Sequence, residues 1–283
     1  MYTISNDYLT VTVKEEGAEL TSIKYNNTEY LWNGDKKYWG RHAPVLFPIV
    51  GSLKDKKCMI KGSEYSMGRH GFARDMTFGL FAKTKDSITF MLESNEETLK
   101  QYPFDFELYI KYELNVRSIK VTYEVVNSGN NAMFFSIGGH PAFNLFADMS
   151  DYYIEFESPE TQKKIVIENA LFRVEDEMVL NNENKIQLNE KSFEIDAIVL
   201  KDLNSSKVWL KSDKTDKAVC MHIAGFPYLG IWSTPDGAPF VCLEPWFGIT
   251  DKEGHNGEFS KKEGIIELNI GEEFSATYSI EVI

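Results

Sequence analysis

Residues 106–126 read FELYIKYELNVRSIKVTYEVV, and this stretch decides the fold class. Apolar side chains alternate with polar ones on both sides of a short link at Asn115–Ser118. Alternation with a period of two is typical of a strand that has one face in the core and one face in water. The stretch therefore predicts an antiparallel hairpin.

The same alternation recurs near both ends of the chain, at Leu9–Val13 and at Phe274–Val282. Turn signals such as Pro235–Gly237 separate the strand-like segments, and the best candidate for a short helix is Asn95–Tyr102. Many short strands with frequent turns are typical of a sandwich or a barrel. Because no repeat, linker or composition break interrupts the pattern, we expect one all-β, mostly antiparallel domain over residues 1–283.

Composition and charge argue against several classes of protein. The formal net charge of −13 disfavours nucleic acid and anionic membranes as partners, although a local basic pocket could still bind a small anion. Cys58, Cys220 and Cys242 are odd in number and widely spaced, which indicates neither a disulfide framework nor a cysteine-based zinc site. The chain starts without a signal-peptide pattern and has no apolar run near the ~20 residues of a membrane span, so we expect a cytoplasmic protein.

Residues 134–144, FFSIGGHPAFN, carry an apolar run into two glycines and then a histidine. Glycine lets a ligand come close to the backbone, and Pro141 biases His140 towards an extended conformation. We expect a strand that ends in a loop and presents this imidazole, whose ordinary pKa of about 6.5 suits proton transfer. The alternative is a turn whose histidine is satisfied by hydrogen bonds.

Two further stretches, Arg41–Gly51 and Arg69–Asp75, combine arginine and histidine with glycine. The prolines in the first stretch argue against a central strand. Arg41 either binds a hydroxyl, carboxylate or phosphate of a ligand or forms a surface ion pair. His70 lies among arginines, whose positive charge lowers the pKa of an imidazole. Arg74 forms an ordinary ion pair in the simpler interpretation.

Glu244 lies in a strongly apolar run, between Leu243 and Pro245. A buried carboxylate is costly unless it is partnered or functional, and desolvation raises its pKa and makes it a better base. Trp232 and Trp246 offer flat faces that suit the C–H faces of a sugar, or they pack in the core. Two histidines and one glutamate are the parts of an acid/base site without a metal. A cupin-like metal site would need closely spaced pairs such as HxH, which the sequence lacks.

These stretches, in this order, resemble the aldose 1-epimerase (galactose mutarotase) superfamily, and above all its LacX-type branch. The resemblance implies a galactose-mutarotase-like β-supersandwich, which agrees with the alternation. It also implies a cofactor-free isomerase that interconverts the α and β anomers of an aldose. The segments that carry the resemblance are Arg41–Gly51, His70–Arg74, Gly139–Asn144, Asp196–Leu200 and Leu243–Trp246.

The resemblance implies a role for each catalytic candidate. Glu244 is the implied general base for the anomeric hydroxyl, and His140 is the implied general acid for the ring oxygen. His70 is the implied second histidine, which supports the charge that develops on the reacting oxygens. The side chains expected to bind the substrate are Arg41, Arg74, Asn144, Asp196 and Trp232.

Two alternatives stay open. The run Gly-Phe-Ala-Arg after His70 resembles the glucose-6-phosphate 1-epimerase branch, and Arg41, Arg69 and Arg74 could then form a phosphate pocket. The stretch at Asp196 lacks the Asp-Arg pattern of that branch, so a free aldohexose is the preferred expectation over a hexose 6-phosphate. The other alternative is a non-catalytic carbohydrate-binding protein. In each case the expected partner is a small-molecule sugar, and the chain is a monomer or a homodimer.

Overall fold

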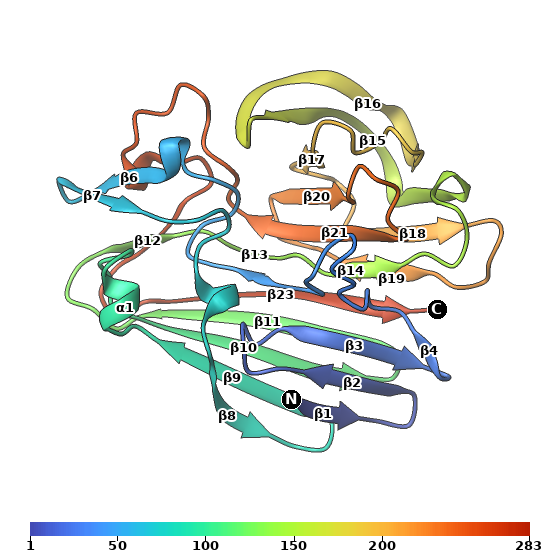
Figure 1. Ribbon diagram of the computed structural model, residues 1–283, viewed down its shortest axis with the longest axis horizontal. Helices are drawn as coiled ribbons and strands as arrows, with labels where there is room; N and C mark the ends of the chain where they lie inside the picture. The colour runs from blue at the N-terminus through green and yellow to red at the C-terminus, as the bar shows by residue number, and fades with distance from the viewer.

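The computed structural model describes the backbone of all 283 residues and every side chain except those of residues 174–176. Strands dominate it, and the large sheet is antiparallel throughout its pairs (Figure 1). The prediction of an all-β, mostly antiparallel fold is therefore confirmed. Within the described residues, no helix is long and apolar enough to span a membrane.

One large sheet runs through most of the chain and joins segments that are far apart in sequence. Two strands lie off its main path, where β14 (Ala142–Asn144) pairs with β21 and β16 (Leu171–Gln187) pairs with β15. Its main path runs in the order β5 (Val45–Leu46), β13 (Ile137–Gly139), β21 (Phe240–Phe247), β20 (Tyr228–Trp232), β17 (Ile198–Lys201), β15 (Tyr152–Glu168), β18 (Lys207–Ser212), β19 (Val219–His222), β23 (Glu273–Val282), β11 (Ser118–Asn127), β10 (Phe106–Asn115), β9 (Ser87–Glu93) and β8 (Gly79–Lys83).

Smaller sheets and short helices complete the structure. The small sheets consist of β1 (Tyr2–Ser5), β2 (Leu9–Val13), β3 (Leu20–Tyr25) and β4 (Thr28–Glu29), of β6 (Lys57–Ile60) with β7 (Ser63–Ser66), and of β12 (Met133–Phe135) with β22 (Ile266–Leu268). The helices are α1 (Glu96–Leu99) and the 3₁₀ turns η1 (Lys54–Lys56), η2 (Ala73–Asp75), η3 (Met149–Asp151) and η4 (Phe259–Lys261). The helix expected at Asn95–Tyr102 is thus one turn long, and the Asn95 side chain caps it by accepting from the backbone of Glu97 and Thr98.

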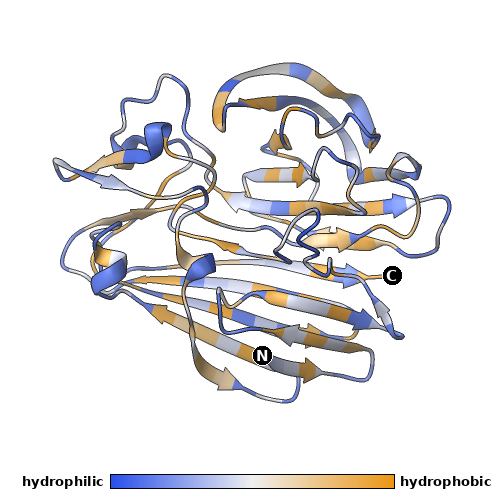
Figure 2. Ribbon diagram, in the orientation of Figure 1, coloured by the Kyte–Doolittle hydropathy of each residue, from blue (hydrophilic) through white to orange (hydrophobic). Residues whose placement is uncertain are grey.

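The predicted hairpin is β10 and β11, paired from Phe106 with Asn127 to Asn115 with Ser118. Every second side chain of β10 is buried, as the alternation requires. These side chains and those of β2 and β3 belong to one apolar cluster, because the β1–β4 sheet lies over the β8–β11 end of the large sheet (Figures 1 and 2). Each large apolar side chain buried there contributes about 1.5–3 kcal/mol, so the sandwich core stabilises the whole sheet.

The β15–β16 hairpin is a long arm that arches away from the centre of the sheet (Figure 1). Its turn at Asn169–Ala170 has positive φ at both residues. The pairing of the two strands shifts register between Glu155 and Glu160 and at several later positions. Such irregularities bend and twist a strand pair, and here the end of the arm reaches the loop that follows β21.

Candidate active site

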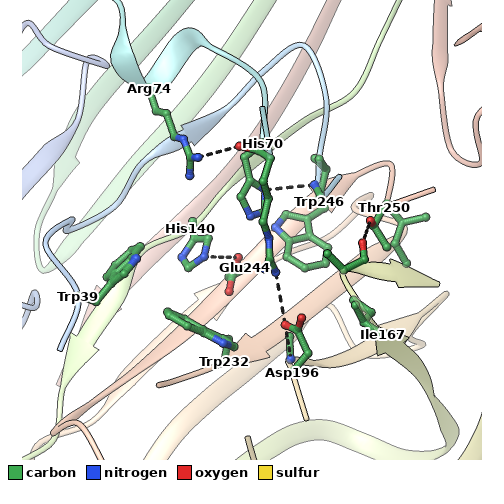
Figure 3. A pocket seen from close by; sticks show the side chains of 16 residues that line it. Trp39, His70, Arg74, His140, Ile167, Asp196, Trp232, Glu244, Trp246 and Thr250 are labelled. Carbon is green, nitrogen blue, oxygen red and sulfur yellow. Dashed lines mark hydrogen bonds and ion pairs between the residues drawn. The ribbon is translucent and has the colours of Figure 1, made fainter. Parts of the chain in front are cut away.

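A cavity of about 240 Å³ gathers most of the side chains that the sequence analysis selected (Figure 3). This volume is below the ~300–1,000 Å³ of sites for drug-sized ligands, so it fits a single small ring better than a nucleotide or an oligosaccharide. The predicted residues that line it are His70, Arg74, His140, Asp196, Trp232 and Glu244.

Glu244 comes from the middle of β21, whose side chains are buried on both faces up to Trp246. Its neighbour across the ladder is Gly230 of β20, where a Cβ would lie 2.6 Å from the Trp246 ring. Burial raises the pKa of Glu244 well above its ordinary value, and Arg69 opposes this shift. The predicted effect of desolvation on this carboxyl is therefore confirmed.

His140 follows β13 and meets Glu244 directly, with its Nε2 3.3 Å from a Glu244 carboxylate oxygen. Trp39 stacks on the imidazole with ring centres 4.8 Å apart, and Trp232 meets it edge-on at 5.4 Å. Gly139 is required nearby, because a Cβ there would lie 2.7 Å from two tyrosine hydroxyl oxygens. Burial lowers the pKa of His140 to about 3. A hydrogen bond with its own backbone opposes this shift, and the nearby arginines add to it.

His70 lies in the loop between β7 and η2, with a backbone φ of +68°. Its Nδ1 accepts a hydrogen bond from the Gly51 amide at 3.1 Å. An amide can only donate, so Nδ1 carries no proton and the neutral ring has its proton on Nε2. Burial lowers the pKa of His70, with Arg69 the next cause, so the predicted direction of the arginine effect is confirmed. The two imidazoles lie edge to face, 5.7 Å apart.

Arg69 and Arg74 bring positive charge to the cavity. An Arg69 nitrogen lies 3.4 Å from Asp196, which also lines the cavity. Arg74 donates to the Arg69 carbonyl at 2.7 Å, and its Nε is 3.8 Å from Asp75. Burial, followed by the charge of Arg41, lowers the pKa of Arg74 to about 10.

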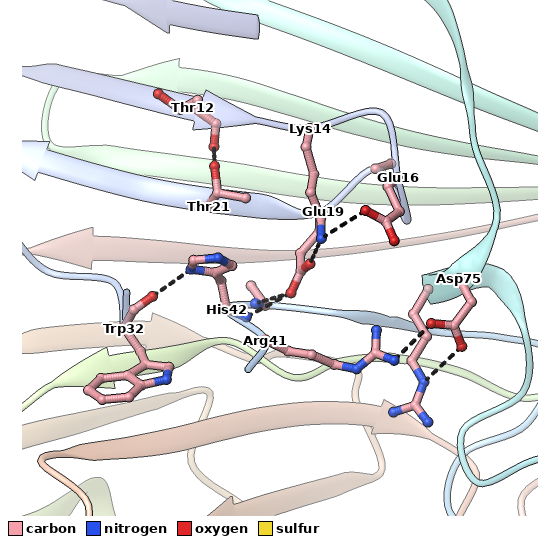
Figure 4. Close-up of polar contacts among 12 residues, drawn as sticks. Thr12, Lys14, Glu16, Glu19, Thr21, Trp32, Arg41, His42 and Asp75 are labelled. Atoms are coloured by element: carbon pink, nitrogen blue, oxygen red, sulfur yellow. Dashed lines mark hydrogen bonds and ion pairs between the residues drawn. The ribbon is translucent and has the colours of Figure 1, made fainter. Parts of the chain in front are cut away.

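Two of the expected substrate contacts do not line this cavity. Arg41 forms an ion pair with Asp75 at 2.8 Å and does not line the cavity (Figure 4). Asn144 donates its side-chain amide to the carbonyls of Glu29 and Leu31 and so holds two chain segments together. For both residues the structure offers a contact within the protein that accounts for the side chain.

Several buried polar atoms around the cavity make few contacts with protein groups. Among the described side chains, His140 Nδ1 and Trp246 Nε1 are buried without a hydrogen bond. Glu244 Oε2 and Arg74 Nε also lack a hydrogen bond and have only ion-pair contacts, with His140 at 3.3 Å and with Asp75 at 3.8 Å. Buried polar atoms are nearly always hydrogen-bonded in folded proteins. Their concentration around one cavity indicates a site that is completed by the polar groups of a ligand.

The sequence analysis missed three parts of this site. Trp39, which stacks on His140, stands in an aromatic pair with Tyr38 just before Arg41, and that pair was the available signal. Thr250 lines the cavity next to Glu244's strand, two residues after Gly248. Ala170, at the turn of the β15–β16 arm, gave no signal because its place depends on a distant contact.

Two groups of described side chains bring together atoms of the kinds that can ligate a metal. Ligand atoms of His140, Cys242 and Glu244 lie within 4.8 Å of one another, and so do those of Cys220, His222 and Glu281. A cysteine ligates a metal as the thiolate. Burial instead raises the pKa of Cys242 well above its ordinary value and that of Cys220 to about 12. Burial therefore favours the protonated thiol in both groups, which disfavours metal binding by these cysteines.

The comparisons with known proteins agree with this site. The family model described as aldose 1-epimerase matches residues 1–267. The plasmid-borne protein LacX of Lactococcus lactis subsp. lactis is 38% identical over 261 residues, which cover 87% of each chain.

Solved structures give the same result. A galactose mutarotase related enzyme from Lactobacillus acidophilus has a TM-score of 0.95 and 37% identity, over 100% of this chain and 97% of that one. A galactose mutarotase-like protein from Lactobacillus casei has a TM-score of 0.92 and 33% identity, over 100% of both chains. The fold is thus galactose mutarotase-like, and the chain belongs to the aldose 1-epimerase family, isomerases that act on carbohydrates.

Proposed function

We propose that the protein interconverts the α and β anomers of a free aldohexose. The observation that carries this proposal is the buried contact of 3.3 Å between His140 and Glu244, which faces a cavity the size of one sugar ring. Mutarotation needs one group that accepts a proton and one that donates it, on the same substrate. Two buried groups with opposite pKa shifts can divide those roles.

In the proposed reaction, Glu244 takes the proton from the anomeric hydroxyl while His140 gives a proton to the ring oxygen. The C1–O5 bond breaks and leaves an open-chain aldehyde. Rotation about C1–C2 presents the other face of the carbonyl, and the two proton transfers then run in reverse. No atom or electron is lost, so the reaction needs no cofactor. Each positioned proton transfer typically contributes about 10²–10⁴ in rate.

The pair carries one proton that the two groups share. Burial disfavours charge on either group, so in this arrangement the proton is on Glu244 and the imidazole is neutral. Sugar hydroxyls that enter the cavity supply hydrogen bonds to the carboxylate, and the proton then crosses the contact of 3.3 Å to His140. His70 donates from Nε2 and supports the oxygen on which negative charge develops. Asp196 and Arg74 hold sugar hydroxyls, and Trp232 and Trp39 face the ring.

Exchange spectroscopy by NMR tests this proposal. Equilibrated glucose and galactose are measured with and without the protein at neutral pH, and catalysis appears as exchange between the two anomeric proton signals. We expect strong exchange with the parent protein and almost none with Glu244→Gln. Absence of exchange on every aldohexose, together with sugar binding that survives loss of both histidines, would instead indicate a carbohydrate-binding protein.

A hexose 6-phosphate is the second candidate substrate, and one observation favours it. Arg69 and Arg74 place two guanidinium groups at the cavity of a protein whose net charge is −13, and the contact of Arg74 Nε with Asp75 is as long as 3.8 Å. Guanidinium groups bind phosphate strongly. Adding glucose 6-phosphate to the same NMR experiment separates the two substrates, because enhancement on the ester alone would make the arginines phosphate ligands.

We further propose a single domain, present as a monomer or a homodimer in the cytoplasm. The large sheet, which uses strands from Val45 to Val282, supports the single domain. The three cysteines are free and buried, which supports a reducing compartment. Sedimentation at micromolar concentration would give the oligomeric state.

A further inference from the structure

A buried ion pair that the proposed reaction does not use lies next to residues that line the cavity. Lys262 Nζ lies 2.9 Å from Asp251, and both side chains are only 1% exposed. Lys262 also donates to the carbonyl of Ile249, which lines the cavity. Taking two charges out of water costs several kcal/mol per ion, so an isolated pair of this kind is weak evidence for added stability. Its contacts show what it does instead.

Asp251 ties the loop after β21 to the loop that carries Gly51. Its second carboxylate oxygen accepts from the Lys54 amide at 2.9 Å, and its own amide donates to the Ser52 carbonyl at 2.9 Å. Its carbonyl accepts from the Phe172 amide, also at 2.9 Å, in the β15–β16 arm. One buried side chain and its backbone therefore connect three segments that are far apart in sequence.

Thr250 continues the same connection beside the cavity. Its hydroxyl oxygen accepts from the Ser52 amide at 3.0 Å and donates to the Ala170 carbonyl at the turn of the arm. Gly51 packs against it so closely that a Cβ on Gly51 would lie 2.4 Å from the Thr250 Cβ. The position of Gly51 is thus fixed from one side by Thr250 and through Ser52 by Asp251.

Gly51 in turn fixes His70 through two reciprocal hydrogen bonds. The Gly51 amide donates to His70 Nδ1 at 3.1 Å, and the His70 amide donates to the Gly51 carbonyl at 2.7 Å. The hydrogen bond at one ring nitrogen decides which tautomer a histidine adopts. A shift of the Gly51 amide would free His70 to turn or to place its proton on Nδ1.

We propose that Lys262, Asp251 and Thr250 are positioning residues that hold Gly51 against His70 and so keep the His70 Nε2–H directed into the cavity. This inference rests on the proposed function for its effect on rate, but not for its effect on the tautomer. A site whose groups are held by a buried supporting layer keeps its geometry better than one that depends on loops alone.

The matched variants are Thr250→Val, which keeps the shape and removes the hydroxyl, and Thr250→Ser, which keeps the hydroxyl. Thr122→Val is the control, because Thr122 is 7% exposed, bonds Thr277 at 2.9 Å and does not line the cavity. NMR of ¹⁵N-labelled histidine reports the His70 tautomer, and anomer exchange reports kcat and KM.

We expect Thr250→Val to mix the two His70 tautomers and to lower kcat about tenfold, the equivalent of one lost hydrogen bond, with a smaller change in KM. Thr250→Ser and Thr122→Val are expected to keep the parent tautomer and kcat. A pure Nε2–H tautomer and an unchanged kcat in Thr250→Val would overturn the inference. A parent protein without any exchange would refute the proposed function, while the tautomer would still test the positioning.

Hydrogen exchange in the parent protein tests the inference even if a variant fails to fold. The amides of Gly51, Ser52 and Lys54 are expected to exchange as slowly as those of the central strands, because each is bonded to a buried group. Rapid exchange of these three amides would show that the loop is not held and would contradict the proposal.

Discussion

Replacing Glu244 by glutamine tests the acid/base pair with the smallest change of shape. The variant keeps a buried side chain of the same length but can no longer accept the proton of the anomeric hydroxyl. We expect the rate of anomer exchange to fall by about 10²–10⁴, which corresponds to about 3–5 kcal/mol of lost transition-state stabilisation. Sugar affinity should change far less, because the amide still offers polar atoms to the cavity.

The same substitution is expected to lower the rate but to raise the stability of the fold, so a gain in stability shows that the lost activity is not due to unfolding. The folded pKa of Glu244 is raised above its unfolded value, so its contribution to stability is complete below the unfolded pKa and is lost as the pH rises towards the folded pKa. Across that range the parent loses about 1.4 kcal/mol for each pH unit, and glutamine removes the loss. Glu244→Gln should therefore unfold at a higher temperature than the parent at neutral pH.

The assay combines NMR exchange on a free sugar with thermal unfolding followed by circular dichroism. Glu160→Gln is the matched control, since Glu160 is also 1% exposed but accepts hydrogen bonds from Asn204 and Ser205 outside the cavity. That variant should lose stability and keep its rate. One positioned proton transfer contributes at least about 10² in rate. If a folded Glu244→Gln protein exchanges anomers within about tenfold of the parent rate, Glu244 is not the base and the reasoning is refuted.

Three further predictions follow from the same geometry. The rate should fall on both sides of a pH optimum. The acid limb should lie well below pH 6.5, because the pKa of His140 is lowered to about 3, and the alkaline limb should lie above the ordinary range of a carboxyl, because the pKa of Glu244 is raised. A rate that stays flat across both limbs would contradict the acid/base pair. Gly71→Ala should destabilise the fold by more than about 1–2 kcal/mol in chemical denaturation, because its Cβ would lie 2.2 Å from the Phe47 carbonyl oxygen at a φ of +71°. Gly62→Ala is the control, since its φ of +79° is similar but its Cβ would meet open space, and it should cost only about 1 kcal/mol. Equal losses in the two variants would refute the steric argument. Exchange should survive dialysis against EDTA, and a loss that zinc restores would assign a role to the cluster of His140, Cys242 and Glu244.

The fold class could be predicted because its signal is local. Alternation in residues 106–126 requires only that successive side chains point to opposite faces, and the structure pairs β10 with β11 as expected. The β15–β16 arm could not be predicted in this way, since its register shifts break the period of two. The pairing of Gly138 with Leu46 and with Trp246 is equally invisible, because it depends on chain segments far apart in sequence.

The site was predictable as a set of residues but not as a geometry. Glycine and proline mark His70, His140 and Glu244 as exceptions to the alternation, and the structure brings the three together. Arg41 could not be separated from Arg74 by sequence, because each stands near a histidine and glycines, and only the structure shows that Arg74 lines the cavity while Arg41 does not. Thr250 was missed for the opposite reason, since a threonine in an apolar run carries no signal of its own.

The cavity also concentrates strained backbone and buried polar atoms that a ligand can satisfy. His70 and Gly71 both have φ near +70°, which for a residue with a side chain costs about 1–2 kcal/mol. His140 Nδ1 and Trp246 Nε1 are buried at the cavity without a hydrogen bond to another described group, so a ligand can satisfy them. A ligand that satisfies those atoms binds only the folded state, so it must raise the unfolding temperature. A sugar that is turned over but gives no thermal stabilisation even far above its KM would mean that the unpartnered atoms serve something other than the substrate.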